Sequence, residues 1–312
     1  MEKVSFVIPC YRSERTIKDV VNEIIRAFVD GCGYDYEIVL VNDCSPDNVW
    51  TVIKSICENN PKVKGICLSR NFGQASAVMA GYSHVTGDYI ITCDDDGQSP
   101  IDATFSILNH LKENDLDVVY GVCPDAKFNL FRKFGSALNS LMASAMFDRP
   151  KNVRIVSFSV ARRYVINEVI KYTHSYPYMS GLVHRSTKKI GYFPVIHRAR
   201  ASGKSGYNLK KLFSVWLNGL TAFSIKPLHL SNYIGIISAF LGFFCGIIVF
   251  IKKLIIPTTA AGWSSVICIM LFLGGIILLV LGLIGEYVGR IYMCINNSPQ
   301  FIVRERLNYE KE

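Results

Sequence analysis

The chain has 312 residues, half of them hydrophobic, and a formal net charge of +9 at pH 7. This length suits one large domain with an appendage. The positive charge suits anionic lipid headgroups or phosphorylated substrates rather than nucleic acid, because no basic helix or aromatic-interleaved RNA motif is present. The ten cysteines include no CxxC pair, which argues against a zinc site or a disulfide framework.

Predicted strands and helices alternate through the first part of the chain. Short apolar or β-branched runs predict strands at residues 4–9, 37–41, 65–68, 89–93 and 118–120. Helical patterns lie between them, at residues 17–28, from about 48, after 73 to about 85, and at 101–114. Because strands joined through helices form right-handed βαβ units, we predict an α/β fold with a mostly parallel sheet covered on both faces.

Polar residues follow several of these predicted strands. Asp43, Arg70 and the acidic run at residues 94–98 each come directly after a different strand. In parallel sheets ligands bind beyond the carboxyl ends of the strands, so we expect these residues to meet in one crevice. The loop after the first strand reads PCYRSE rather than GxGxxG, and there is no P-loop lysine motif, which excludes a dinucleotide fold and a P-loop.

The acidic run predicts a cation site. Strand side chains alternate, so Asp94 and Asp96 should share one face, with Gln98 if the chain stays extended, and Asp95 should face the other way. All are hard oxygen ligands, which suit Mg²⁺ or Mn²⁺. The alternative is a solvated acidic turn. We favour the metal site because the carboxylates end an apolar strand, where burying uncompensated charge is costly.

Two apolar segments, 231–251 and 262–285, contain no charged residue. Each exceeds the roughly 20 residues that a helix needs to cross a bilayer, so we predict a membrane hairpin. Basic residues are more numerous outside the hairpin than in its connecting loop, which places the loop outside the cell. With no N-terminal leader, the first domain is expected in the cytoplasm. Residues 209–223 form an amphipathic pattern, read as an interfacial helix, with a core-facing helix as the alternative.

Four segments carry a family resemblance, in their order and spacing: residues 9–14, 41–45, 69–73 and 94–98. They resemble the GT-A glycosyltransferases of family two. Among these, the chain is most similar to the polyprenyl-phosphate glycosyltransferases, which include the dolichyl-phosphate mannose synthases and the bacterial undecaprenyl-phosphate sugar transferases. The resemblance continues through the RxxGxSxY sequence at residues 200–207, the juxtamembrane helix, the two spans and residues 285–292. It covers nearly the whole chain.

The resemblance implies metal-dependent transfer of a sugar, with inversion, from a nucleoside-diphosphate sugar to a polyprenyl phosphate, with UDP favoured over GDP as the nucleotide. It assigns the nucleoside to Pro9, Tyr11, Glu14 and Asp43, and the metal and diphosphate to Asp94, Asp96 and Gln98. The resemblance also implies that Asp96, Arg200 and Ser205 are catalytic. It adds Arg70, Asp95 and Lys204 as substrate-binding residues. Because a phosphate monoester is already largely dianionic at neutral pH, no general base is needed.

Two positions depart from the family pattern. Many relatives have Asp-Phe-Arg or Ser-Phe-Arg where this chain has Ser157-Phe158-Ser159, and Gly-x-Arg where it has Gly121-Val122-Cys123. Ser157 is therefore expected to be dispensable. The missing arginines have these candidate replacements: Lys127, Arg132, Arg154, Arg162 and Arg163.

These expectations define four segments: a cytoplasmic GT-A catalytic domain at 1–206, a juxtamembrane helix at 207–229, a two-span hairpin at 230–292 and a cytoplasmic tail at 293–312. The expected location is the bacterial inner membrane, and the expected pathway is cell-envelope glycan modification. The expected assembly is a homo-oligomer, for which the resemblance to the bacterial transferases suggests a tetramer. Two alternatives remain open: a processive polysaccharide synthase and a membrane protein that binds nucleotide sugar without turnover. The sequence has no Gln-x-x-Arg-Trp motif, which polysaccharide synthases usually carry.

Overall fold

The structure is a computed structural model that describes residues 1–29, 33–123, 154–175, 177–196, 262–295 and 299–309, with isolated residues between 233 and 255. The chain divides into two units. The first comprises Met1–Tyr207 and Ser298–Glu312, and the second comprises Asn208–Asn297.

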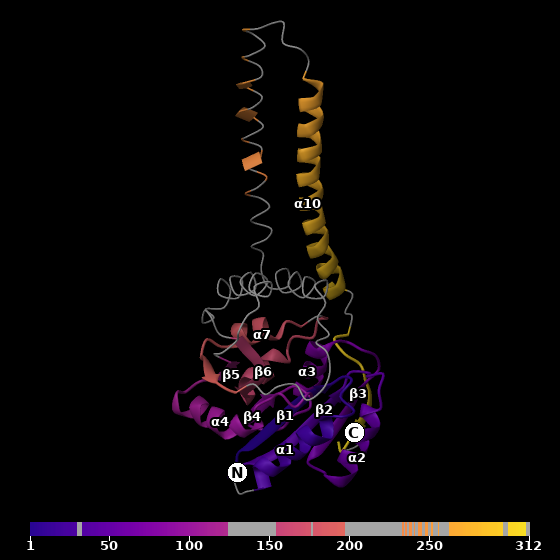
Figure 1. Cartoon of the computed structure of the whole chain (residues 1–312), viewed down its shortest axis with the longest axis vertical. Coiled ribbons are helices and arrows are strands. Elements are labelled where there is room, and N and C mark those ends of the chain that lie inside the picture. The colour runs from indigo at the N-terminus through magenta and orange to yellow at the C-terminus, as the bar shows by residue number, and fades with distance from the viewer. Residues whose placement is uncertain are drawn as a thin grey trace. The chain divides into compact units, whose positions relative to one another are not determined.

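The first unit is built on one twisted sheet (Figure 1). Its described strands run in the order β7-β5-β6-β4-β1-β2-β3-β8. Their bounds are β1 Lys3–Cys10, β2 Asp35–Asn42, β3 Val63–Leu68, β4 Tyr89–Thr92, β5 Val118–Cys123, β6 Arg154–Arg162, β7 Ile190–Pro194 and β8 Val303–Leu307. β1 to β4 are mutually parallel, as is the β5–β7 pair, whereas β6 and β8 run antiparallel to their neighbours. The predicted α/β class with a mostly parallel sheet is confirmed.

Helices lie between the strands along the chain. They are α1 Ile17–Val29, α2 Val49–Asn59, α3 Gln74–Tyr82, α4 Thr104–Glu113, α6 Arg163–Val169 and α7 Met179–Ser186. Of these, α6 and α7 connect β6 to β7. The helix predicted at 101–114 begins with a separate 3₁₀ turn, η1 Ile101–Ala103. Strands β6, β7 and β8 were not predicted, because short runs such as IGYFP and VRERL lack a long apolar stretch.

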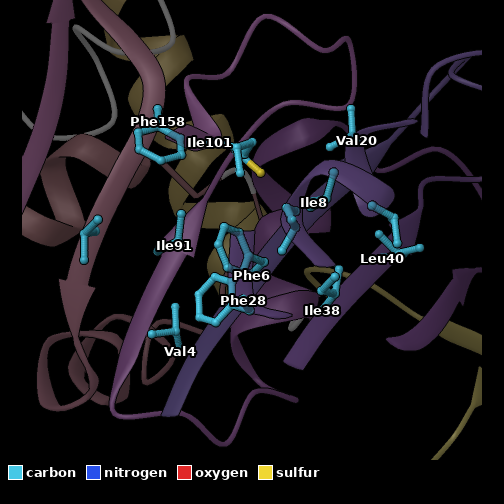
Figure 2. Packing of buried hydrophobic residues seen from close by; sticks show 14 of the residues in the cluster. Val4, Phe6, Ile8, Val20, Phe28, Ile38, Leu40, Ile91, Ile101 and Phe158 are labelled. Atoms are coloured by element: carbon cyan, nitrogen blue, oxygen red, sulfur yellow. The ribbon is translucent and has the colours of Figure 1, made fainter. Parts of the chain in front are cut away.

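The main hydrophobic core lies between the sheet and α1, α2 and α4. Alternate residues of β1, including Phe6 and Ile8, point into it, and Phe6 lies beside Phe28 of α1 (Figure 2). The Phe6 and Phe28 rings pack edge to face, with centroids 5.7 Å apart. Burial of one face of β1 fixes its register, because a shift by one residue would turn these side chains away from the core.

Helix α3 packs closely against the strands at Gly81. A Cβ atom at Gly81 would lie 2.3 Å from Cγ1 of Val7, so only glycine allows this approach. The opposite end of α3 begins at Gln74, directly after the loop that follows β3. The N-terminal end of this helix is therefore held next to the carboxyl ends of the strands.

The C-terminal segment of the described chain belongs to the first unit. Strand β8 pairs with β3, and the side chain of Asn308 donates hydrogen bonds to the carbonyl oxygens of Cys57 and Val63, each at 2.7 Å. The Trp50 indole donates to Glu305 at 3.0 Å. The sequence predicts a tail outside the catalytic domain at residues 293–312, whereas in the structure residues 303–307 form a strand of its sheet.

In the second unit, the described helix α10 runs over Trp263–Ile295. Its 33 residues give a length of about 50 Å at about 1.5 Å per residue. The window Phe272–Gly289 has a mean hydropathy of 2.0 and no residue buried by the rest of the chain, so its length and composition suffice to cross a membrane. The interfacial helix predicted at 209–223 lies outside the described residues, as does most of the span predicted at 231–251.

Candidate active site

The candidate site lies at the carboxyl ends of β1 to β4. The chain runs outward from β1 to β2 and β3, then returns to place β4 on the other side of β1. Such a reversal of strand order opens a crevice where α/β proteins bind ligands. The loops after these four strands carry most of the predicted site residues.

Asp94 follows β4, and its carboxylate receives a hydrogen bond from a neutral side chain. Gln74 Nε2 donates to its Oδ1 at 2.9 Å. Burial raises the pKa of Asp94 to about 6, and the negative charges of Asp96 and Asp95 add to the rise, while the Ser157 and Gln74 side chains oppose it. The carboxylate is thus poised for a cation that would offset this repulsion.

Asp95 bonds a different part of the fold. Its Oδ2 accepts the backbone N–H of Tyr11 at 2.9 Å, and its own carbonyl oxygen accepts the hydroxyl of Thr16 at 2.6 Å. Burial raises the pKa of Asp95, and the Tyr11 N–H partly offsets this. Asp95 therefore ties the end of β4 to the loop after β1.

The chain turns immediately after Asp96. Gly97 has a φ of +74°, in the left-handed region that favours glycine, and the backbone N–H of Gln98 donates to Asp96 Oδ1 at 3.1 Å. The extended backbone that would have carried Gln98 onto the face of Asp94 and Asp96 does not form. Strand alternation therefore does not assign Gln98 to that face.

The residues at the end of β4 fit a divalent cation whose coordination is completed from outside the protein. Within the described part of the chain, no three His, Cys, Asp or Glu side chains converge into a ready-made metal site. Asp94 and Asp96 nevertheless supply hard carboxylate oxygens from the same loop after β4, the ligand type that Mg²⁺ and Mn²⁺ prefer. Mg²⁺ is commonly held by one or two carboxylates together with substrate phosphates and water, and this donor set matches that pattern.

Asp43 shapes the loop between β3 and α3. Its carboxylate accepts the backbone N–H of Phe72 at 2.7 Å and that of Gly73 at 2.9 Å. Burial raises its pKa, and these two N–H groups oppose the rise. Gly73 has a φ of +89°, so the loop needs glycine there. One function of Asp43 is thus to fix the segment that carries Arg70.

Glu14 links two loops in a reciprocal pair of hydrogen bonds. Its backbone N–H donates to Asp47 at 3.0 Å, and its carboxylate accepts the N–H of Asn48 at 3.2 Å. Nearby, Tyr11 is 43% exposed and Arg12 lies over its ring, 5.5 Å from the centroid. Pro9 lies in β1 opposite Val41. The loop after β1 therefore presents an exposed aromatic ring at the crevice.

Of the predicted phosphate-binding residues, the structure describes Arg70 but not the segment at residues 200–205. The Arg70 guanidinium lies over the Phe72 ring at 4.7 Å. Arg200, Lys204 and Ser205 lie outside the described residues, as do Lys127 and Arg132.

The proposed replacement of the missing arginines by Arg162 or Arg163 is wrong. Arg162 pairs in register with Tyr89 at the start of β4 and bonds Asp117, and Arg163 donates to Gly87, all at the opposite end of the sheet from Asp94. Arg154 does not lie at that end of the sheet. It pairs with Cys123, the last residue of β5.

Sequence reasoning missed Gln74 and Ser157, whose side chains are placed at the Asp94 carboxylate. The β4–β6 pairing aligns Thr92 with Ser159, and continuing it by two residues brings Asp94 opposite Ser157. Sequence alone offered no such signal, because β6 was not predicted. Gln74 could have been found from its place directly after the loop at residues 69–73.

The site agrees with comparisons to known proteins. The family model described as "Glycosyl transferase family 2" matches residues 5–170, more than half of the chain, and the model described as "GtrB C-terminal hairpin" matches residues 226–291. The chain is 33% identical over 309 residues to the "Uncharacterized glycosyltransferase YkcC" of Bacillus subtilis, covering 99% of this chain and 95% of the relative.

A second relative and one solved structure are also similar to this chain. The chain is 30% identical to the "SfII prophage-derived bactoprenol glucosyl transferase" of Shigella flexneri, covering 97% of this chain and 98% of the relative. A crystal structure of Mycobacterium tuberculosis glucosyl-3-phosphoglycerate synthase with UDP superimposes with a TM-score of 0.52 at 16% identity, covering 70% of this chain and 78% of that one, which shows a shared fold. The chain therefore belongs to glycosyl transferase family 2 and is a glycosyltransferase.

Proposed function

We propose that this enzyme transfers a sugar, with inversion, from a nucleoside-diphosphate sugar to undecaprenyl phosphate or a related polyprenyl phosphate. The observation that carries the proposal is the similarity to the Shigella flexneri bactoprenol glucosyl transferase, which spans the catalytic domain and the apolar C-terminal segment together. Similarity confined to the catalytic domain would leave the acceptor open. Similarity across both parts favours a lipid-linked acceptor.

The donor is proposed to bind over the carboxyl ends of β1 to β4. Asp94 and Asp96 would hold Mg²⁺ or Mn²⁺, which when bound neutralises the leaving diphosphate. The exposed Tyr11 ring offers a surface for the nucleoside, with UDP favoured over GDP. Arg70 extends from the loop that Asp43 fixes, so its guanidinium is available to phosphate oxygens.

The acceptor needs cationic groups rather than a base. A phosphate monoester is already largely dianionic near neutral pH, so its oxygen does not require deprotonation. Bringing this anion against the donor diphosphate requires positive charge and alignment. We assign this role to Arg200, with Lys204 and Ser205 beside it in the RxxGxSxY segment.

The enzyme is proposed to span the bacterial inner membrane twice, with its catalytic domain in the cytoplasm. The pairing of β8 with β3 supports an even number of crossings, because the chain leaves the first unit after Tyr207 and rejoins it from Ser298. If α10 crosses once, the segment before it must cross as well. The excess of basic residues flanking the apolar segments favours a cytoplasmic domain.

The decisive experiment incubates purified full-length protein with Mn²⁺, undecaprenyl phosphate and a panel of radiolabelled nucleotide sugars. The proposal expects label in an organic-extractable lipid, with one sugar preferred. Label in insoluble polymer would instead identify a processive synthase. Nucleotide-sugar binding without labelled product would identify a non-catalytic binding protein.

A further inference from the structure

Two neutral side chains from separate elements are placed at the Asp94 carboxylate. Gln74 is the first residue of α3, and its Nε2 lies 2.9 Å from Asp94 Oδ1. Ser157 lies in β6, and continuing the β4–β6 register two residues past the Thr92–Ser159 pair brings it opposite Asp94. Both side chains are exposed to solvent, so neither is needed to fill the core. Their contacts with Asp94 therefore call for an explanation other than packing.

The backbone around each donor is fixed by other interactions. Asp43 binds the N–H groups of Phe72 and Gly73, which sets where α3 begins and hence where Gln74 lies. Ser157 lies in β6, two residues from Ser159, which pairs with Thr92 at the end of the β4–β6 ladder. The loop bonds and the strand thus place the two side chains, as is needed for residues that orient a ligand-binding carboxylate.

The chemistry of the donors matters as much as their position. Each carboxylate oxygen can accept two hydrogen bonds, so a single donor leaves a lone pair free. A lysine or arginine at either position would neutralise Asp94 and compete with a bound cation. An amide and a hydroxyl fix the orientation of the carboxylate while leaving its negative charge available. Groups of this kind around metal ligands raise metal affinity.

We propose that Gln74 and Ser157 are positioning residues that orient the Asp94 carboxylate toward a divalent cation shared with Asp96. This inference rests on the proposed function. It also revises the expectation that Ser157 is dispensable, because the continued β4–β6 register places Ser157 opposite a proposed metal ligand.

The test measures Mn²⁺ binding directly, by the electron paramagnetic resonance signal of free Mn²⁺, in full-length detergent-purified protein saturated with UDP. Gln74→Met keeps the length of the side chain and removes the donor, and Ser157→Ala removes the hydroxyl. Each should weaken Mn²⁺ binding roughly 10-fold or more, the usual effect of losing such a contact. Gln74→Lys should weaken it as well, because its ammonium group would pair with Asp94.

The transfer assay supplies a second readout. For Gln74→Met and Ser157→Ala, the Mn²⁺ concentration giving half-maximal rate should rise, while the rate at saturating Mn²⁺ should largely recover. Ser83→Ala is the matched control, because Ser83 lies at the other end of α3 and its hydroxyl bonds only the Met79 carbonyl. This control should bind Mn²⁺ like the wild type, and all variants should keep the wild-type Tm within a few degrees.

Wild-type Mn²⁺ binding by both Gln74→Met and Ser157→Ala would overturn the inference while leaving the proposed function intact. Failure of the wild type itself to bind Mn²⁺ in the presence of UDP would overturn it too. Absence of lipid product from a wild type that binds Mn²⁺ normally would instead count against the proposed function alone.

Discussion

The side chains of Ser5 and Glu37 form a buried hydrogen bond of 2.6 Å between β1 and β2, at the end of the sheet opposite the candidate site. Glu37 also accepts the Lys64 ammonium at 2.9 Å and the backbone N–H of Thr86. Burial alone would raise the pKa of Glu37, but these partners outweigh it and lower the pKa to about 2. A buried anion therefore ties three segments together.

This arrangement predicts a specific acid sensitivity. Because the folded pKa lies below the unfolded value, the ionised group stabilises the fold above about pH 4.5, by up to about 3 kcal/mol, and this is lost as the pH falls toward 2. Thermal unfolding measured from pH 7 to pH 3 should show Glu37→Gln with a lower Tm than wild type at pH 7 and a flatter dependence below pH 4.5. Parallel pH profiles for the two proteins would contradict the prediction. Glu58→Gln, on the exposed side of α2, is the control.

Asp43→Asn should damage the loop that carries Arg70. An amide offers only one acceptor oxygen, so one of the N–H groups of Phe72 and Gly73 would lose its partner, at a cost of about 1–3 kcal/mol. We expect a lower Tm and a higher KM for the nucleotide sugar. An unchanged KM combined with a lower Tm would mean that the loop does not contact the donor.

The sequence predicted the first four strands and their connections because each strand is a continuous apolar run ended by a polar or turn-forming residue. It also predicted that Asp43, Arg70 and Asp94 follow three different strands whose carboxyl ends meet in one crevice. It could not predict β8, since VRERL carries three charged residues in five and is stabilised by pairing with β3 and by Asn308. Pairings between distant segments of this kind leave no local pattern.

The same limit applies within the site. The partners of Asp94 come from residues 20 positions before it and 63 after it, so no spacing rule links them. The sequence also placed Gln98 by assuming an extended chain, and the positive φ of Gly97 replaces that extension with a turn. The Asp-Gly pair could have signalled this turn.

Metal removal and single substitutions should distinguish the roles of Asp95 and Asp96. If Asp96 holds the cation, excess EDTA should abolish transfer and Asp96→Asn should reduce the rate by orders of magnitude. Asp95→Asn should be milder, because an amide oxygen still accepts the N–H of Tyr11. Full activity in EDTA would rule out the metal, and equal losses in the two variants would show that Asp95 is not limited to bonding the loop after β1.

Arg200 is predicted to align the acceptor phosphate. Loss of an arginine clamp worth roughly 3 kcal/mol should slow Arg200→Ala at least about a hundredfold. The measurement is steady-state turnover with undecaprenyl phosphate varied, in the same detergent for both proteins. Lys188→Ala, an exposed basic residue before β7, is the control and should retain normal turnover. A rate for Arg200→Ala within a few-fold of wild type would show that other residues align the acceptor phosphate.

The proposed topology predicts which positions are open to the outside of the cell. A membrane-impermeant thiol reagent should label a cysteine at Thr259, in the loop between the two apolar segments, in intact cells of a background without accessible native thiols. A cysteine at Glu312 should be labelled only after the membrane is permeabilised.

Glu312 is a better position for the internal cysteine than Asn308. The Asn308 side chain donates hydrogen bonds to the carbonyl oxygens of Cys57 and Val63, so replacing it would disturb the fold. Labelling of Glu312→Cys but not Thr259→Cys in intact cells would reverse the orientation, and a cytoplasmic nucleotide sugar could then not reach the site. Labelling of both in intact cells would place Thr259 and Glu312 on the same side of the membrane, so α10, which lies between them, would not cross it and the proposed hairpin would be wrong.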